Sequence, residues 1–304
     1  MESDTLGDGA KGSGFLTTSN QSAADAASPL RASDAASTYV IYHGNCPDGF
    51  GGAWSAWCVL GDAAHYCPVS HGDPPPPLPS DASVLMIDFA FPREITLELR
   101  ARVRDLVILD HHKSAQEEIG DLPYATFDMD RSGAMLAWRY CHPNVEPPAL
   151  IGYVQDRDLW RFVLPDSREV TAALGSYPMD FQVWSGLDVA DLAREGQAIL
   201  RFRDQTVESI VGFARWGEIG GHRVPIVNAT AHWSDVGEAM LKKYPDAPFV
   251  GAWFEDSEGI RRWSLRSRPD FDVSVVAKQL GGGGHAQASG FREPSRQRAE
   301  GEGQ

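Results

Sequence analysis

Histidines and aspartates follow three apolar runs of this chain, at the point where each run ends. His43 follows the run 39–42, Asp88 follows the run 84–87, and the triplet Asp110-His111-His112 follows the run 106–109. Short apolar runs rich in β-branched residues predict buried strands. The carboxyl ends of parallel strands meet at one edge of a sheet, which is where ligands bind. We therefore expect these polar side chains to lie close together.

Carboxylates and imidazoles gathered in this way are typical ligands of divalent metals. Two metal ions about 3.5–4 Å apart can neutralise a phosphate ester, activate a water molecule and stabilise the leaving oxygen. Oxygen-rich ligation with some imidazole suits Mn²⁺, with Mg²⁺ or Co²⁺ as plausible substitutes. Asp48 and Asp156 complete the set of candidate ligands. The residues thus predict a metal-dependent phosphoesterase.

The elements that must position these residues alternate between strand and helix patterns. Helices are predicted around residues 53–60 and 93–102, between the apolar runs. Near-continuous apolar strands that alternate with helices indicate a parallel sheet covered on both faces. A long helix is predicted over 187–214, where apolar residues recur at helical intervals. This helix is expected to connect two domains.

The chain beyond the long helix predicts a second, smaller α/β domain. Strands are predicted in the segments 224–227, 249–254 and 262–265. Ser234 is expected to cap a helix that has acids in its first turn and lysines in its last, which suits the helix dipole. The glycine run 281–284 is expected to form an ordered binding turn, because His285 follows it directly.

Five segments are expected along the chain. They are a disordered tail over residues 1–38, a metal-binding catalytic domain over 39–186, a connecting helix over 187–215, a substrate-binding domain over 216–292 and a second disordered tail over 293–304. Both tails are rich in small and polar residues and lack apolar periodicity, which is typical of disorder.

Charge and composition narrow the class of partner. The net charge is −15, whereas proteins that grip long nucleic acids usually carry a basic surface, because phosphate neutralisation supplies most of that affinity. We therefore expect a small anionic substrate and no long duplex.

No apolar run reaches the roughly 18 residues that a membrane span requires, and a cytoplasmic protein without membrane contact is expected. The four cysteines lack C-x-x-C spacing and are interpreted as packed, reduced thiols.

The motifs, taken in their order, resemble those of the DHH phosphoesterase family. The matching segments are His43-Gly-Asn-Cys-Pro-Asp48-Gly, Ile87-Asp88, Asp110-His111-His112 and Gln155-Asp156-Arg157-Asp158. Residues 281–285, followed by 288–291, resemble the glycine-rich signature of the C-terminal domain associated with that family. The resemblance covers roughly residues 39–292. It implies an α/β fold in which a parallel-sheet domain and a smaller mixed α/β domain enclose an active site in the cleft between them.

The resemblance also implies a role for each matched position. The metal ligands would be His43 and Asp48 for one ion, Asp88 as a bridge, and His111 with Asp156 for a second ion. The catalytic positions would be His112, facing the scissile phosphate, and Asp110, orienting the histidines. The contacts to the substrate's phosphate or sugar would be Arg266, Ser267, Gly283, Gly284 and His285.

Phe50 departs from the family pattern, which usually has a second aspartate at this position. Without that carboxylate, a water or a nearby acid such as Asp158 substitutes, the second metal binds weakly, or only one ion is bound. Asp158 could equally pair with Arg157 or Arg161 on the surface. Two further features are expected to be structural: the segment 131–133 as a helix start, with a site role as the alternative, and the remaining histidines, His71 among them.

The sequence therefore predicts an enzyme that hydrolyses phosphoester bonds of a small nucleotide, dinucleotide or short oligonucleotide with a metal-activated water. One alternative is a processive single-strand exonuclease, which would need a basic channel with stacking aromatic residues. A second is a catalytically inactive nucleotide-binding regulatory module, for which Phe50 is the only support. The exact substrate and the oligomeric state stay open at this point.

Overall fold

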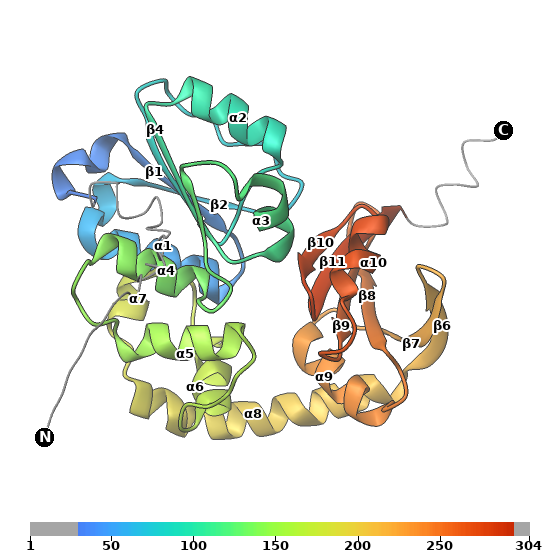
Figure 1. Ribbon diagram of the computed structural model, residues 1–304. Coiled ribbons are helices and arrows are strands. Elements are labelled where there is room, and N and C mark those ends of the chain that lie inside the picture. The colour runs from blue at the N-terminus through green and yellow to red at the C-terminus, as the bar shows by residue number, and fades with distance from the viewer. Residues whose placement is uncertain (1–29, 295–304) are drawn as a thin grey trace, which may run out of the picture.

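The computed structural model describes residues 30–294, which form two α/β units joined by one long helix. The connecting helix, α8, spans Val189–Gly212 and runs beneath both units (Figure 1). The side chain of Asp188 accepts hydrogen bonds from the backbone amides of Ala190 and Asp191 and so caps the start of α8. No helix within residues 30–294 is long and apolar enough to cross a membrane.

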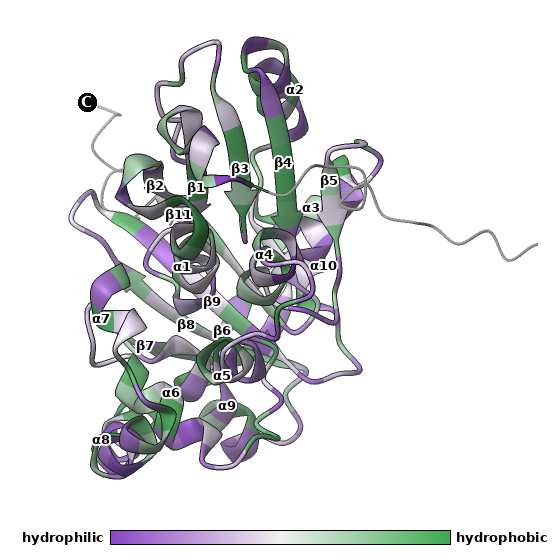
Figure 2. Ribbon diagram, turned by 90° about the vertical axis from the view of Figure 1, so that its left-hand side faces the viewer, coloured by the Kyte–Doolittle hydropathy of each residue, from purple (hydrophilic) through white to green (hydrophobic). Residues whose placement is uncertain are grey.

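The first unit is built on a five-stranded sheet in the order β2-β1-β3-β4-β5. Its strands are β1 (Thr38–His43), β2 (His65–Val69), β3 (Ser83–Ile87), β4 (Asp105–Asp110) and β5 (Ala125–Phe127). Every neighbouring pair is parallel, which confirms the predicted parallel sheet. Figure 2 shows the hydrophobic character of β3 and β4 at the centre of this sheet.

Helices cover both faces of the first sheet. The helices of the first unit are α1 (Pro47–Leu60), α2 (Arg93–Arg102), α3 (Lys113–Ile119), α4 (Gly133–Cys141), α5 (Ala149–Asp158), α6 (Ser167–Leu174) and α7 (Phe181–Ser185), with short 3-10 helices η2 (Ala32–Ser37) and η3 (Gly61–Ala63). Successive residues of β3 alternate between two cores: Leu85 and Ile87 pack in the core with α1 and α4, whereas Val84 and Met86 pack in the core with α2. Because side chains alternate along a strand, an apolar run such as β3 buries both faces.

The second unit has a six-stranded sheet in the order β10-β11-β9-β8-β7-β6. Its elements are β6 (Arg215–Ile219), β7 (His222–Asn228), α9 (Trp233–Lys243), β8 (Phe249–Glu255), β9 (Ile260–Ser267), α10 (Val273–Gln279), β10 (Gly283–His285) and β11 (Ala288–Pro294). The pair β7-β8 is parallel and the other pairs are antiparallel, so the predicted mixed α/β architecture is confirmed.

Two local expectations differ from the structure. The helix α9 begins after His232, which has a left-handed backbone (φ 56°), so Ser234 lies inside the helix and is not its cap. The predicted N-terminal tail also extends too far: residues 32–37 form η2, Ala35 is buried, and Thr38 begins β1. The sequence of η2 is rich in alanine and serine, and its order comes from packing against α1 rather than from local pattern. The remainder of both predicted tails lies outside the described residues, apart from residues 30–31 and the end of β11.

Contacts cross between the two units on two sides. On one side, α3 contacts the second unit, where Lys113 Nζ lies 2.5 Å from the carboxylate of Asp272 and Glu117 pairs with Lys278. On the other side, the guanidinium of Arg168 on α6 donates two hydrogen bonds to the carboxylate of Glu238 on α9. A cavity of about 820 Å³ lies between the units and is lined by residues of both.

Candidate active site

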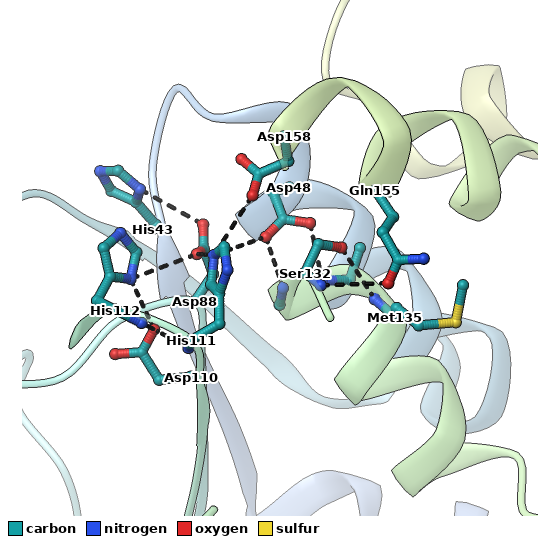
Figure 3. A network of polar contacts seen from close by, with 12 residues as sticks. His43, Asp48, Asp88, Asp110, His111, His112, Ser132, Met135, Gln155 and Asp158 are labelled. Carbon is teal, nitrogen blue, oxygen red and sulfur yellow. Dashed lines mark hydrogen bonds and ion pairs between the residues drawn. The ribbon is translucent and has the colours of Figure 1, made fainter. Parts of the chain in front are cut away.

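Three adjacent strand ends bring the histidines and aspartates together. His43 ends β1, Asp88 directly follows β3, and Asp110 ends β4. Since β1, β3 and β4 are neighbours in the sheet, their carboxyl ends open at one edge. Figure 3 shows these side chains pointing toward one another. Gly49 allows α1 to start against the end of β1, because a Cβ at this position would overlap the carbonyl oxygen of His43.

His111 is the centre of this group. Its Nε2 lies 3.1 Å from Asp88 Oδ1, 3.5 Å from Asp48 Oδ2 and 3.4 Å from Asp158 Oδ2. A single imidazole N–H cannot satisfy three carboxylates at once. Burial lowers the pKa of His111, but the hydrogen bond to Asp88 and the charges of Asp158 and Asp48 raise it to about 10. The arrangement therefore holds more negative charge than the imidazole can balance.

Asp88 occupies the bridging position of the group. Its Oδ1 faces His111, whereas its Oδ2 lies 3.5 Å from Nδ1 of His43. The residue is buried and has a left-handed backbone (φ 55°), a conformation that costs free energy for an aspartate and marks a constrained position. Burial raises the pKa of Asp88, but hydrogen bonds to His111 and His43 hold it well below its usual value.

Asp48 is buried against the start of α4. Its carboxylate accepts hydrogen bonds from the backbone amides of Gly133 (2.6 Å) and Ala134 (3.0 Å), where a helix start favours negative charge. Burial and the nearby charges of Asp158 and Asp88 nevertheless raise the pKa of Asp48 well above its usual value. Such crowded, buried carboxylates stay ionised most readily beside a cation.

Asp110 holds His112 by its ring and its backbone. Asp110 Oδ1 lies 2.7 Å from Nδ1 of His112 and accepts hydrogen bonds from the backbone amides of His112 (3.3 Å) and His111 (2.7 Å). Burial lowers the pKa of His112, and the charge and hydrogen bond of Asp110 raise it to about 9. His285 of the second unit stacks on His112, with ring centroids 4.4 Å apart. His112 thus lies at the junction of the two units.

The position expected for Asp156 is taken by Asp158. The carboxylate of Asp156 accepts hydrogen bonds from the backbone amides of Val163 (3.1 Å) and Leu164 (3.2 Å), so it holds the loop after α5 and does not reach His111. Successive residues of a helix are turned by about 100°, so residues two apart point in nearly opposite directions. The expectation that Asp156 joins the metal ligands is therefore corrected, and the alternative that Asp158 pairs only at the surface is wrong.

Phe50 belongs to the hydrophobic core. Its ring stacks on Phe181 at 4.8 Å and meets Trp184 edge-on at 4.9 Å. The side chain is buried in the core that α1 shares with α4. Of the substitutes considered from the sequence for the missing aspartate, Asp158 is the one that the structure places beside the cluster.

The predicted substrate contacts of the second unit, Arg266 and Ser267, differ in the hydrogen bonds that they already make within the protein. Arg266 lines the cavity and donates hydrogen bonds to Ser234 Oγ (2.7 Å) and Ser264 Oγ (3.0 Å). Among residues 30–294, it forms no ion pair with a carboxylate. Ser267 also lines the cavity, but its hydroxyl lies 2.7 Å from the carbonyl oxygen of Phe271, so its hydrogen is used within the second unit.

The glycine run folds as the edge of the second sheet. Gly284 has a positive φ of 133°, and a Cβ there would meet the carbonyl oxygen of Ala288 at 2.6 Å, so glycine is required. The backbone amide of Gly284 donates to Ser114 Oγ of the first unit at 3.2 Å. This amide was expected to approach an anion, and instead it joins the two units. Gly283 and His285 line the cavity.

Two residues of the site, His71 and Cys46, were given no site role from the sequence, and a third, Gly133, was given one only as an alternative. His71 lies beyond β2, and its ring centroid is 5.3 Å from that of His43. Cys46 has its sulfur within 4.8 Å of donor atoms of His43 and Asp88. Gly133 carries the amide that binds Asp48. For His71, the available signal was its place after a strand at the same sheet edge as His43, but the segment 65–69 was not recognised as a strand.

The residues fit a divalent cation. Two buried atoms of the group, His111 Nδ1 and Asp158 Oδ2, have no hydrogen-bond partner among the described residues. Donor atoms of Asp48, Asp88 and His111 lie within 4.8 Å of one another, and so do those of Asp88, Asp110 and His112. This set of carboxylate oxygens and imidazole nitrogens matches the donors that Mn²⁺, Mg²⁺ or Zn²⁺ accept. Partnerless buried polar atoms in a converging set of donors indicate a ligand-binding site.

The chain is similar to several known proteins. The model of the DHHA1 domain matches residues 223–300. An uncharacterized protein of Acanthamoeba polyphaga mimivirus is 29% identical over 282 residues, which is 83% of this chain and 66% of that protein. Oligoribonuclease NrnB of Bacillus subtilis (strain 168) is 41% identical over 70 residues, which is 23% of this chain and 17% of NrnB. The chain thus spans about two thirds of the viral relative's length and a small part of NrnB.

Among solved structures, the pGpG-specific phosphodiesterase PggH of Vibrio cholerae is similar with a TM-score of 0.47 and 11% identity, over 86% of this chain and 95% of that chain. The DHHA1 match covers the unit that carries Arg266 and the glycine run. The histidines and aspartates of the N-terminal motifs, other than Asp156, converge at one sheet edge (Figure 3), and residues of both units line the cavity there. The chain carries a DHHA1 domain at residues 223–300, and its N-terminal motifs resemble those of the DHH phosphoesterase family.

Proposed function

We propose that this protein hydrolyses phosphoester bonds of a nucleotide or short oligonucleotide in a reaction that depends on a divalent metal. The observation that carries the proposal is the convergence of Asp48, Asp88, His111 and Asp158 at a cavity whose opposite wall carries Arg266. A metal site and an arginine that face each other across a cavity suit an anionic ester. The DHHA1 match and the similarity to an enzyme named oligoribonuclease support this class of substrate.

We infer that Asp48, Asp88, His111, His43 and Asp158 hold the metal. When bound, Mn²⁺ or a similar ion would activate a water molecule and neutralise the phosphate oxygens. Asp88 would bridge two ions if two bind, because its two oxygens face different histidines.

His112 is proposed to act on the substrate. Asp110 engages its Nδ1 and fixes the orientation of its ring, which leaves Nε2 for a phosphate oxygen or the leaving oxygen. With the pKa raised to about 9, His112 is protonated at neutral pH in the metal-free protein and can donate a hydrogen bond or a proton. His285, stacked on the other side, shields this ring from solvent.

The size of the cavity and the contacts that flank it favour a short substrate over a long strand. The contact of Lys113 with Asp272 bridges the units on one side, and that of Arg168 with Glu238 bridges them on the other. A processive exonuclease needs an open basic groove that tracks the strand. A cavity of about 820 Å³ is within the size range of small-molecule sites, roughly 300–1,000 Å³.

The test is a hydrolysis assay with Mn²⁺ on a dinucleotide, a 20-mer and bis-p-nitrophenyl phosphate. The wild-type protein should cleave the dinucleotide faster than it shortens the 20-mer, and Asp88→Asn or His111→Gln should abolish cleavage. Asp130→Asn is the matched control, since Asp130 is an exposed surface residue, and it should retain wild-type rates. Processive degradation of the 20-mer would favour the exonuclease, whereas nucleotide binding without turnover under Mn²⁺, Mg²⁺ or Co²⁺ would favour the inactive regulatory module.

A further inference from the structure

Two arginines from different helices share one carboxylate in the wall of the cavity. Arg157 of α5 donates a hydrogen bond to Asp235 Oδ2 at 3.3 Å, and Arg203 of α8 lies 3.4 Å from Asp235 Oδ1. All three residues line the cavity. Asp235 belongs to α9, so the group joins the two units and the connecting helix. None of these arginines has a role in holding the metal.

Positive charge exceeds negative charge in this part of the cavity. Arg157 and Arg203 share the carboxylate of Asp235, whose side chain is 10% exposed. Among residues 30–294, the only other acid within ion-pair distance of either arginine is Asp204, which is mostly exposed (63%). Solvent screens an exposed acid. Arg266, on the same wall, forms no ion pair among residues 30–294. In a chain with a net charge of −15, this local surplus is a specific feature.

The donors of the two arginines are only partly used. The Nε atom of Arg203 is buried and has no hydrogen-bond partner among the described residues. The face of the Arg157 guanidinium is stacked on Trp160 at 4.0 Å, and its edge hydrogen-bonds to Asp235 with one nitrogen. Trp160 itself lines the cavity and has a left-handed backbone (φ 55°). A buried N–H without an acceptor is costly, so a ligand that supplies one fits this place.

We propose that Arg157 and Arg203 form a second anion subsite that binds a phosphate group of the substrate other than the one being cleaved. This inference rests on the proposed function and deepens it: the preferred substrate would be a short nucleotide with a terminal phosphate besides its scissile ester. Arg157 and Asp158 are consecutive at the end of α5, but Asp158 faces His111 while Arg157 faces Asp235. The subsite is therefore next to the metal ligands and directed toward the second unit.

The chemistry of the group points to phosphate. Guanidinium groups bind phosphate through paired N–H donors. A planar guanidinium that Asp235 already holds in place loses little side-chain conformational entropy when a phosphate binds. The stack of Arg157 on Trp160 fixes the plane of the fork. Arg266 lines the same cavity, and its guanidinium donates hydrogen bonds to the hydroxyl groups of Ser234, next to Asp235, and of Ser264.

The test compares binding of one dinucleotide with and without a 5′-phosphate, by calorimetry in EDTA so that no hydrolysis occurs. The wild-type protein should bind the phosphorylated form about 10- to 100-fold more tightly, as expected for charge-assisted hydrogen bonds. Arg203→Gln should reduce this ratio to near 1, and Arg203→Lys should keep part of it because the charge remains but the fork is lost. Circular dichroism would establish that both variants are folded.

Arg201→Gln is the matched control, because Arg201 is exposed on the same helix, two residues away, and it should keep the wild-type ratio. A wild-type ratio near 1, or an unchanged ratio in folded Arg203→Gln and Arg203→Lys, would overturn the subsite. Loss of hydrolysis is a separate result: if no ester is cleaved with Mn²⁺ but the binding ratio behaves as expected, the proposed function fails and the subsite stands.

Discussion

Replacing Gly133 with alanine should disturb the metal ligands without removing any of them. Gly133 is the first residue of α4, and its amide donates to Asp48 Oδ2 at 2.6 Å. A Cβ added to Gly133 would lie 2.5 Å from Asp88 Cβ and 3.0 Å from Asp48 Oδ2. Both neighbours are buried, so neither can turn away into solvent.

The size of the effect follows from these contacts. Ordinary contacts between carbon atoms are about 3.5–4.0 Å, so Asp88 and α4 must separate by about 1 Å. Overpacking of this kind costs about 1–3 kcal/mol of unfolding free energy. A 1 Å misplacement of a catalytic group can lower the rate about 100-fold. We expect Gly133→Ala to reduce kcat/KM by about that factor and to weaken Mn²⁺ binding, while the protein stays folded.

The assay measures kcat/KM on a dinucleotide, Mn²⁺ affinity by calorimetry and unfolding by denaturant. Gly152→Ala is the matched control, since a Cβ at Gly152 in α5 meets only Leu164 Cδ1 at 3.8 Å. It should stabilise the helix by about 0.5–1 kcal/mol and leave activity unchanged. If Gly133→Ala kept both wild-type Mn²⁺ affinity and wild-type activity, the close packing of α4 on Asp48 and Asp88 would not be what positions the ligands.

Two further predictions concern the ligands themselves. Asp158→Ala should lower Mn²⁺ affinity at least about 10-fold, measured by calorimetry. Asp156→Ala should mainly lower the unfolding free energy, by about 1–3 kcal/mol in a denaturant titration, because its carboxylate accepts hydrogen bonds from backbone amides. The reverse pattern would show that the two assignments are wrong. Mn²⁺ affinity should rise as pH rises toward 9–10, because protons compete with the metal for His111, whose pKa is raised to about 10, and because protonated His112 beside the site, with its pKa raised to about 9, repels a cation. For the same reason, these two histidines stabilise the metal-free protein below the ordinary histidine pKa of about 6.5, and that contribution is lost as pH rises through 9–10; Mn²⁺ affinity that is flat with pH would contradict the shifts.

The architecture was largely readable from local pattern. Strands such as β3 and β4 are short apolar runs, and a run that buries both faces predicts a parallel sheet without knowledge of any long-range contact. The helix predicted over 187–214 is observed at Val189–Gly212, because its apolar spacing repeats over many turns. The short helix η2 before β1 was not predicted. Its alanines and serines show no hydrophobic periodicity, and the segment is ordered by packing on α1.

The sequence by itself determined which strand ends carry His43, Asp88 and the triplet 110–112, because a strand's position along the chain fixes the residue at its carboxyl end. The tertiary structure decided which aspartate of α5 faces them. Asp156 and Asp158 are equally acidic, but the packing of α5 sets its rotation and turns Asp158 toward His111. Packing also brings the second unit to the site. Its residue Arg266, more than 100 positions from the triplet 110–112 along the chain, lines the same cavity only because the two units pack beside each other on α8. Local periodicity specifies elements, whereas the rotation and docking of those elements depend on contacts that no local pattern contains.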